Sequence, residues 1–422
     1  MTPPDDAGHS DAAARHVTER VARRSYGKLV ALLSARTRDV AGAEDALSQA
    51  FAEALAEWPR SGAPDNPEAW LMAVAKRRRI DAIRRGVSAQ AAAPHLEMLA
   101  REIEDAAAMD DDIPDARLRL MFACAHPAIE ESIRAPLILQ TILGFGAAEI
   151  ASAFLVAPAA MSQRLTRAKT RIRQAGVPFR MPEKQELPER LDAVLAAIYA
   201  AFAEGWVDAA GADARRRNLA QEGIWLGRLV ASLLPQEPEA LGLLALMLHA
   251  EARHAARRDA QGEYVPLAAQ DTTLWDHAAI REAEHLIHAA SRMSRLGRYQ
   301  LEAAVQSAHA VRRLSGKADW AAIERLYDAL LAFTGSPVVA INRAAAIAET
   351  RGPAAALAAL DAISGDARLA EFQSFWAARA EFLAKANQPT AAWQAYERAI
   401  GLESDPAARR FLQARQDGLA VH

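Results

Sequence analysis

Apolar residues recur at helical spacing along almost the whole chain, and runs in which they alternate with period two are absent. Alanine and leucine, both strong helix formers, dominate the composition, and aromatic residues are few. This pattern predicts an all-α fold. At about 150 residues per domain, a chain of 422 residues is expected to form two or three domains.

Residues 147–173 read as two short helices broken by a tight turn. The turn falls at Ala157-Pro158, because proline fixes φ and suits the first turn of the next helix. Four residues of the second helix are expected to face the core: Met161, Leu165, Ala168 and Ile172. Seven are expected to face outward: Ala159, Ser162, Gln163, Arg164, Arg167, Lys169 and Arg171.

This outward face is typical of a helix that lies in the DNA major groove. A bidentate arginine–guanine pair is the commonest specific contact, so Arg164 is the expected base reader, with Gln163 next for adenine. Lys169 and Arg171 suit phosphates better. An ordinary amphipathic helix pair with a solvated basic face is the alternative.

A second basic patch lies in residues 67–85. The preceding helix is expected to end at Trp58-Pro59, with Ala46, Leu47, Ala50, Phe51 and Leu55 as its buried stripe. A polar loop with Asp65 and Asn66 follows. Trp70, at its spacing in the next helix, is expected to lie in the core rather than to stack on a base. The basic side chains expected to face outward are Lys76, Arg77, Arg78, Arg79, Arg84 and Arg85.

The segment 87–113 changes character, because it is alanine-rich and then strongly acidic. It is predicted to be a flexible acidic linker between the two basic modules. The net charge of −3 hides this asymmetry, and nucleic-acid affinity depends on local clusters rather than on the total.

Beyond residue 186 the chain continues as helices joined by short turns, and an internal period appears near its end. Gly352-Pro353 matches Gln388-Pro389, and Leu360 matches Tyr396, at an offset of about 36 residues. A helical repeat close to the tetratricopeptide (TPR) type is predicted, with an unrelated helical bundle as the alternative.

No cofactor or metal is expected. The single cysteine, Cys124, excludes an internal disulfide and is expected to be a buried apolar residue. The acidic polar N-terminus is no signal peptide, and no apolar run approaches the roughly 18 residues that a membrane span needs. A soluble cytoplasmic protein without membrane association is therefore expected. The scattered histidines and acids, His249, Glu251, His254, His285 and His288, follow no metal-binding motif.

In this order the motifs resemble a bacterial extracytoplasmic-function (ECF) RNA polymerase sigma factor of the subgroup with a TPR-like extension. AGAEDALSQAFAEAL and PEAWLMAVAKRRRIDAIRR are similar to region 2, and RLRLMFACAHPAI with the helix pair is similar to region 4. The resemblance implies region 2 at 12–86, the linker at 87–113, region 4 at 114–178 and the extension at 186–422. It implies no enzymatic activity.

The resemblance also implies partners, namely promoter DNA and the clamp helices and flap of the β/β′ subunits of core RNA polymerase. A protein partner of the extension is a further candidate. Polymerase docking would use Glu44, Asp45, Gln49 and Glu53. The −10 element would be bound by Asp65, Asn66, Trp70, Lys76, Arg77, Arg78, Arg79, Arg84 and Arg85, and the −35 element by the seven outward residues of the helix pair.

Two other functions fit parts of the sequence. One is a conventional DNA-binding regulator that uses the helix pair alone, with the repeats for dimerisation or ligand binding. The other is a protein-binding scaffold with solvated basic helices. The sigma factor is favoured because it accounts for the docking helix and for two basic modules that flank an acidic linker.

Overall fold

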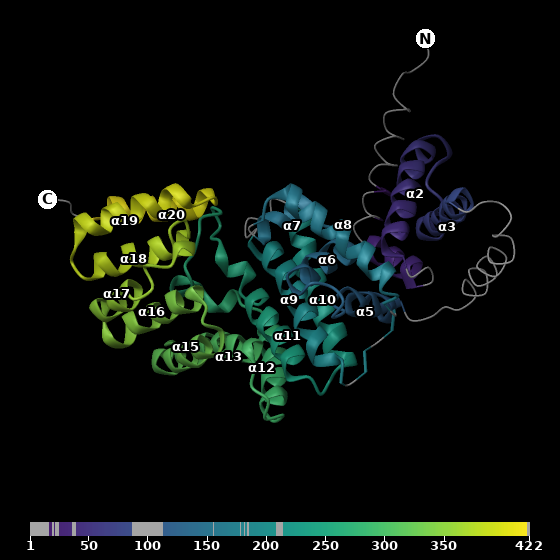
Figure 1. Ribbon diagram of the computed structural model, residues 1–422. Coiled ribbons are helices and arrows are strands. Elements are labelled where there is room, and N and C mark those ends of the chain that lie inside the picture. The colour runs from purple at the N-terminus through teal and green to yellow at the C-terminus, as the bar shows by residue number, and fades with distance from the viewer. Residues whose placement is uncertain are drawn as a thin grey trace, which may run out of the picture. The chain divides into compact units, whose positions relative to one another are not determined.

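The computed structural model describes residues 17–18, 21, 25–35, 39–86, 113–154, 156–177, 179–180, 182–183, 185–207 and 214–419. The predicted all-α fold is confirmed, because these residues form helices and connections, with one isolated antiparallel bridge between Arg258 and Tyr264. The chain divides into two compact units, Met1–Ala201 and Phe202–His422 (Figure 1). The division falls inside α9 (Leu187–Val207). The extension was expected to begin at residue 186, one residue before this helix starts.

In unit 1, the described residues 17–18, 21 and 25–35 are helical, and α2 (Val40–Ser61) and α3 (Pro67–Gly86) follow. Asp39 starts α2, because its side chain accepts a hydrogen bond from the Gly42 amide. The expected end of this helix at Trp58-Pro59 is wrong. The helix continues to Ser61 and ends at Gly62, whose φ of +79° suits glycine.

The buried stripe of α2 is largely as predicted. Ala46, Leu47 and Ala50 are buried and Phe51 is half-buried, but Leu55 is 46% exposed, so its assignment to the stripe is wrong. Trp58, at 1% exposure, anchors the C-terminal turn instead. Trp58 lies one helical turn beyond Ala54, on the side that packs against α3, and the large indole gives this turn its core contact.

Four helices complete the second half of unit 1 before α9: α5 (Ile113–Cys124), α6 (Glu131–Leu143), α7 (Ala147–Ala153) and α8 (Pro158–Gln174). Helix α6 ends at Gly144 in the left-handed conformation, which satisfies its last carbonyls and turns the chain toward α7. Cys124 is fully buried, as predicted, and its thiol lies 3.5 Å from the Thr141 hydroxyl. Burial raises the pKa of this thiol to about 12.

Unit 2 contains the end of α9 and the helices that follow it. In its first part, α11 (Pro238–Glu251) packs against α10 (Ala214–Leu233), α12 (His277–Ser291) and α13 (Arg298–Ala310), so α11 is buried over nearly its whole length. The helices here are α10 (Ala214–Leu233), α11 (Pro238–Glu251), η1 (His254–Arg257), η2 (Leu267–Ala269), η3 (Thr272–Leu274), α12 (His277–Ser291), α13 (Arg298–Ala310), α14 (Arg312–Ser315) and α15 (Trp320–Thr334).

The predicted period appears as two helical hairpins followed by α20 (Pro406–Asp417). The first hairpin is α16 (Pro337–Arg351) with α17 (Pro353–Asp361), and the second is α18 (Gln373–Lys385) with α19 (Pro389–Leu402). Both helices of the first hairpin begin 36 residues before their counterparts. The matched residues Leu360 and Tyr396 are both buried in one shared core.

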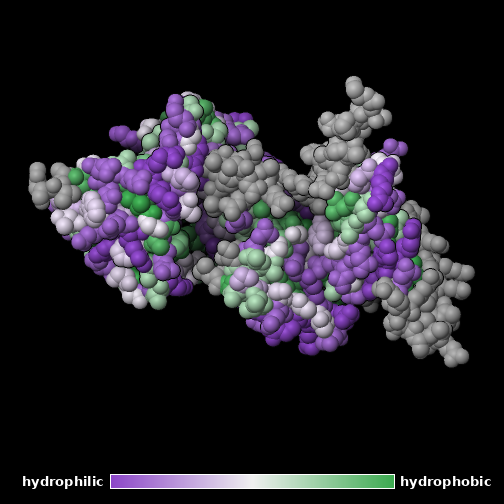
Figure 2. All heavy atoms as spheres, turned by 90° about the horizontal axis from the view of Figure 1, so that it is seen from above, coloured by the Kyte–Doolittle hydropathy of each residue, from purple (hydrophilic) through white to green (hydrophobic). Residues whose placement is uncertain are grey.

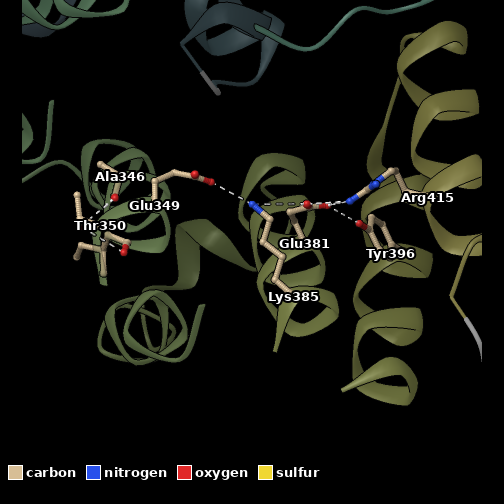
Figure 3. Close-up of polar contacts among 8 residues, drawn as sticks. Ala346, Glu349, Thr350, Glu381, Lys385, Tyr396 and Arg415 are labelled. Carbon is tan, nitrogen blue, oxygen red and sulfur yellow. Dashed lines mark hydrogen bonds and ion pairs between the residues drawn. The ribbon is translucent and has the colours of Figure 1, made fainter. Parts of the chain in front are cut away.

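Polar contacts join these hairpins to α20. The Lys385 ammonium lies 3.1 Å from Glu349 of the first hairpin, and the Tyr396 hydroxyl donates to Glu381 at 2.9 Å (Figure 3). Arg415 of α20 reaches the same Glu381 carboxylate at 2.8 Å. Glu381 therefore ties three successive helices together.

The visible surface is mostly hydrophilic, with small apolar patches between polar residues (Figure 2). Among the described residues, no helix is both long and apolar enough to cross a membrane.

Candidate nucleic-acid interface

The four predicted docking residues of α2 do not share one environment. Asp45 and Gln49, one turn apart, are both exposed. Glu53 is half-buried and forms an ion pair with Arg78 of α3. Glu44 is only 8% exposed, because it faces α8 rather than solvent. Of the four, Asp45 and Gln49 are therefore the ones accessible from solvent.

Glu44 forms an ion pair with Lys169 of α8. Its Oε2 accepts from the Lys169 ammonium, while its buried Oε1 has no hydrogen-bond partner. Burial raises the pKa of this carboxyl, and the nearby Lys169 charge only partly offsets that effect. A residue predicted for the polymerase and a residue predicted for DNA phosphates are thus engaged with each other.

Asp39 adds a second link between α2, α3 and α8. Its carboxylate caps α2, pairs with Arg79 at 2.5 Å and lies 3.8 Å from Arg173. Asp39 was not among the predicted site residues. The signal available was an acid placed directly before a helix, which predicts a cap but not its two distant partners.

The basic patch of α3 is only partly open. Arg77 is exposed, whereas Arg78 and Arg79 are held by Glu53 and Asp39. Lys76 is half-buried. The side chains of Arg84 and Arg85 lie outside the described residues. Of the predicted basic residues that the structure describes here, Arg77 is exposed without an acidic partner in the same patch, while the Arg78 side chain is 43% exposed but paired with Glu53.

The loop before α3 presents two exposed residues, Asp65 and Asn66. The Asn66 side-chain oxygen accepts from the Ala69 amide at 3.0 Å, so this oxygen caps α3 rather than being open to a base. Trp70 is half-buried and packs edge-on against Trp58, with ring centroids 5.4 Å apart. The preference for a packed Trp70 agrees with this geometry.

Helices α7 and α8 form the predicted helix pair. The four predicted core residues of α8 are buried. Helix α7 packs against α8, and its residue Ile150 is only 1% exposed. Proline at the start of α8 lies in its first turn, as expected. Of the predicted outward residues, five are exposed: Ala159, Ser162, Gln163, Arg167 and Arg171. The other two are half-buried: Lys169, at 14% side-chain exposure, is turned toward α2, and Arg164 is turned toward the start of α6.

Arg164, the expected base reader, is held by two residues at the start of α6, the N-cap residue Glu130 and Ser132. Its guanidinium donates to Glu130 at 3.1 Å and to the Ser132 hydroxyl. The Ser132 hydroxyl, followed by the Arg164 charge, lowers the pKa of Glu130. Glu130 was not among the predicted site residues, because it lies 34 positions from Arg164 in the sequence and only the fold brings the two together.

An open pocket of about 210 Å³ lies beside this contact. Three arginines of α8 line one side of it, and residues 128–133 line the other: Arg164, Arg167, Arg171, Ala128, Ile129, Glu130 and Ile133. Arginines in a row of this kind suit phosphate or base-edge acceptors. In the part of the chain that the structure describes, no group of three His, Cys, Asp or Glu residues is arranged for a metal.

Comparison with known proteins gives two family matches. The sigma-70 region 2 family matches residues 21–88, which include α2 and α3. The "Family of unknown function (DUF6596)" matches residues 190–291. No solved structure matches the chain.

The chain is also 39% identical over 388 residues to the "Uncharacterized protein R00370" of Rhizobium meliloti (strain 1021), and the alignment covers 90% of each chain. Region 2 implies interaction with the RNA polymerase core and with promoter DNA, and the sigma-70 family is a family of transcription factors. The chain therefore belongs to the family of the Rhizobium meliloti protein, and its sigma-70 region 2 domain supports a sigma factor.

Proposed function

We propose that this protein is an ECF-type sigma factor that binds core RNA polymerase and directs promoter-specific initiation in the cytoplasm. The observation that carries the proposal is the region 2 match over α2 and α3, in the same unit as a second basic helix, α8. A regulator that binds DNA through α7 and α8 alone has no use for region 2.

The roles follow from exposure. Asp45 and Gln49 dock on a basic helical surface of the polymerase, where such charges set register and association rate. Arg77 and the exposed residues of the loop before α3 bind the −10 region. Gln163, Arg164, Arg167 and Arg171 bind the −35 region, with Arg164 as base reader and the other arginines on phosphates.

Unit 2 serves as the regulatory extension in this proposal. Its two hairpins repeat at the 36-residue offset and bury one shared core, which supports a TPR-like array. Such an array presents a surface for a partner protein. Because the array is covalently fused to the sigma modules, binding of that partner is coupled to promoter selection.

Transcription in vitro with bacterial core polymerase and a promoter library tests the proposal. The full chain is expected to give specific transcripts, and Asp45→Lys is expected to reduce them strongly. Glu371→Lys, an equal charge change at an exposed site of unit 2, is the matched control and is expected to leave them unchanged. No transcripts from the full chain, together with tight binding to duplex DNA without polymerase, would establish the conventional regulator instead.

A further inference from the structure

Ion pairs with carboxylates hold many of the arginines in unit 2. Arg228 pairs with Glu282 and Arg415 with Glu381, each at 2.8 Å, and Arg410 pairs with Glu263 at the same distance. Four half-buried arginines differ: Arg253, Arg257, Arg312 and Arg313. Among the described residues, none of these four forms an ion pair with a carboxylate, and we call them the arginine cluster.

The arginine cluster is made by segments that follow two packed helices. Arg253 and Arg257 follow α11, while Arg312 and Arg313 follow α13. Helices α11 and α13 pack closely and run in the same direction, because Glu239 accepts from the Gln300 amide at their starts and Arg253 reaches Gln306 near their ends. Their C-terminal ends therefore bring the two pairs together. Each pair is fixed locally by a short helical turn, η1 or α14.

Neutral groups accept the hydrogen bonds of the arginine cluster. Arg253 donates to the Gln306 side chain at 2.6 Å and to the His249 carbonyl at 3.4 Å. Arg312 donates to the carbonyls of Leu267 and Gln270, at 2.7 and 2.9 Å. Arg257 donates to the Trp206 carbonyl, and Arg313 donates to the Ala310 carbonyl at 2.9 Å.

The positive charges act on one another and on the histidines beside them. Burial, followed by the charge of Arg257 and then of Arg312, lowers the pKa of Arg253 to about 10. Burial and the Arg253 charge lower the pKa of His249 and of His309 to about 4, so both rings are neutral near pH 7. The cluster is therefore a region of concentrated positive charge with little compensation.

The nearest compensating groups are too few. The last turns of α11 and α13 each contribute roughly half a negative charge, against four guanidinium groups. Glu251 and Asp405 both act on Arg257, but Glu251 accepts from Gln221 and Asp405 pairs with Arg258. Withdrawing several like charges from water without counter-charges is costly, so a mobile anion would stabilise this region.

We propose that the arginine cluster is a binding site for an oxyanion, the carboxylate or phosphate group of a small ligand. The planar fork of guanidinium donors matches both groups. The Arg257 guanidinium stacks 3.7 Å from the centre of the Trp206 ring, which holds one fork in a fixed orientation. The site lies in unit 2, partly within the matched segment 190–291 of unknown function, and it does not depend on promoter recognition.

Thermal unfolding of the full chain in phosphate, in citrate and in sodium chloride of equal ionic strength tests the site. Phosphate, citrate or both are expected to raise Tm by about 5 °C once the anion exceeds its Kd about 100-fold. A response to phosphate alone assigns a phosphate ligand, and a response to citrate alone assigns a carboxylate. An equal effect of all three salts overturns the proposal.

Variants locate the effect. Arg253→Gln and Arg257→Gln are expected to abolish the anion-specific rise in Tm. Arg228→Gln is the control, because it removes an arginine of the same unit that is paired with a carboxylate, and it is expected to keep the rise. A rise that persists in both cluster variants overturns the proposal. Isothermal titration calorimetry with phosphate or citrate provides a second measurement on Arg257→Lys, which keeps the positive charge. The anion affinity of this variant is expected to fall about tenfold, because the planar fork of guanidinium donors is lost.

Discussion

Lys169 of α8 and Glu44 of α2 form an ion pair across 125 sequence positions, with side-chain exposures of 14% and 11%. The first residue belongs to the proposed −35 helix and the second to the proposed docking helix. Arg173 approaches Asp39 beside them, so two basic residues of α8 face two acids at the start of α2. While this contact lasts, neither helix is fully open to its outside partner.

Removal of the Glu44 charge is therefore expected to release α8. Breaking a buried pair costs about 3 kcal/mol, because one charge is left without its partner. Glu44→Gln keeps the shape of the side chain and does not touch the DNA-facing side of α8. We expect this variant to bind a −35 duplex about tenfold more tightly without polymerase, measured by fluorescence anisotropy.

Glu53→Gln is the matched control, because it removes an acid of the same helix that pairs with Arg78 of α3 and not with α8. Equal duplex affinity for the wild type and both variants would mean that the Glu44–Lys169 contact does not restrain α8. Absence of any duplex binding in all three would count against α8 as a DNA reader.

Glu130 is expected to compete with DNA for Arg164. The two side chains are 3.1 Å apart, and Glu130 remains largely exposed. Arg164→Ala should cost about 1–3 kcal/mol of discrimination at one base pair of the −35 element. Glu130→Gln should instead strengthen duplex binding, because an acidic group beside the phosphates is removed. Competition binding with single-base variants of the duplex measures both effects.

Arg379→Ala, which breaks an ion pair with Asp361 in unit 2, is the control for general charge effects. If Arg164→Ala weakens binding to every sequence equally, Arg164 binds a phosphate and does not read a base.

Local patterns allowed much of this fold to be predicted. Met161, Leu165, Ala168 and Ile172 are buried because helical periodicity alone fixes which side of α8 faces inward. The 36-residue offset between Leu360 and Tyr396 was visible for the same reason, since each hairpin repeats one short pattern. The same periodicity predicted a buried Leu55, and this prediction is wrong. Burial of Leu55 would need a neighbouring element to cover it, which the pattern of its own helix does not specify.

The candidate site was harder to predict, because exposure in a charged helix depends on distant partners. Lys169 and Arg171 look alike in the sequence, yet only Arg171 is exposed. Arg78 and Arg77 are adjacent, yet Glu53 engages only Arg78. Pairing of this kind is decided by contacts between helices far apart in the chain, which hydrophobic periodicity does not encode.

Acidification is expected to destabilise unit 2 through its buried histidines. Burial lowers the pKa of His249 and of His309 to about 4, against about 6.5 in an unfolded chain. Unfolding therefore takes up protons below pH 6.5, so this stability is complete above pH 6.5 and is lost as the pH falls toward 4. Each histidine should account for about 2 kcal/mol between pH 7 and pH 5.

Urea unfolding of the full chain at both pH values, followed by tryptophan fluorescence, measures this loss. His249→Gln should reduce the loss by about 2 kcal/mol, whereas the same change at the exposed His285 should leave it as in the wild type. A wild-type stability that does not change between pH 7 and pH 5 would show that neither ring is held neutral by burial.

The close packing of α11 on α13 is expected to depend on Gly242. A Cβ atom at this position would lie 2.7 Å from the Gln300 amide nitrogen and 3.0 Å from its Cα, and backbone atoms inside a helix cannot move aside cheaply. Gly242→Ala should therefore reduce the free energy of unfolding by about 1–3 kcal/mol. Gly401 lies in α19 with nothing within 4 Å of the same atom, so Gly401→Ala should add about 0.5–1 kcal/mol. Urea midpoints of the two variants give the comparison, and stabilisation by both would mean that α11 and α13 can separate to admit a methyl group.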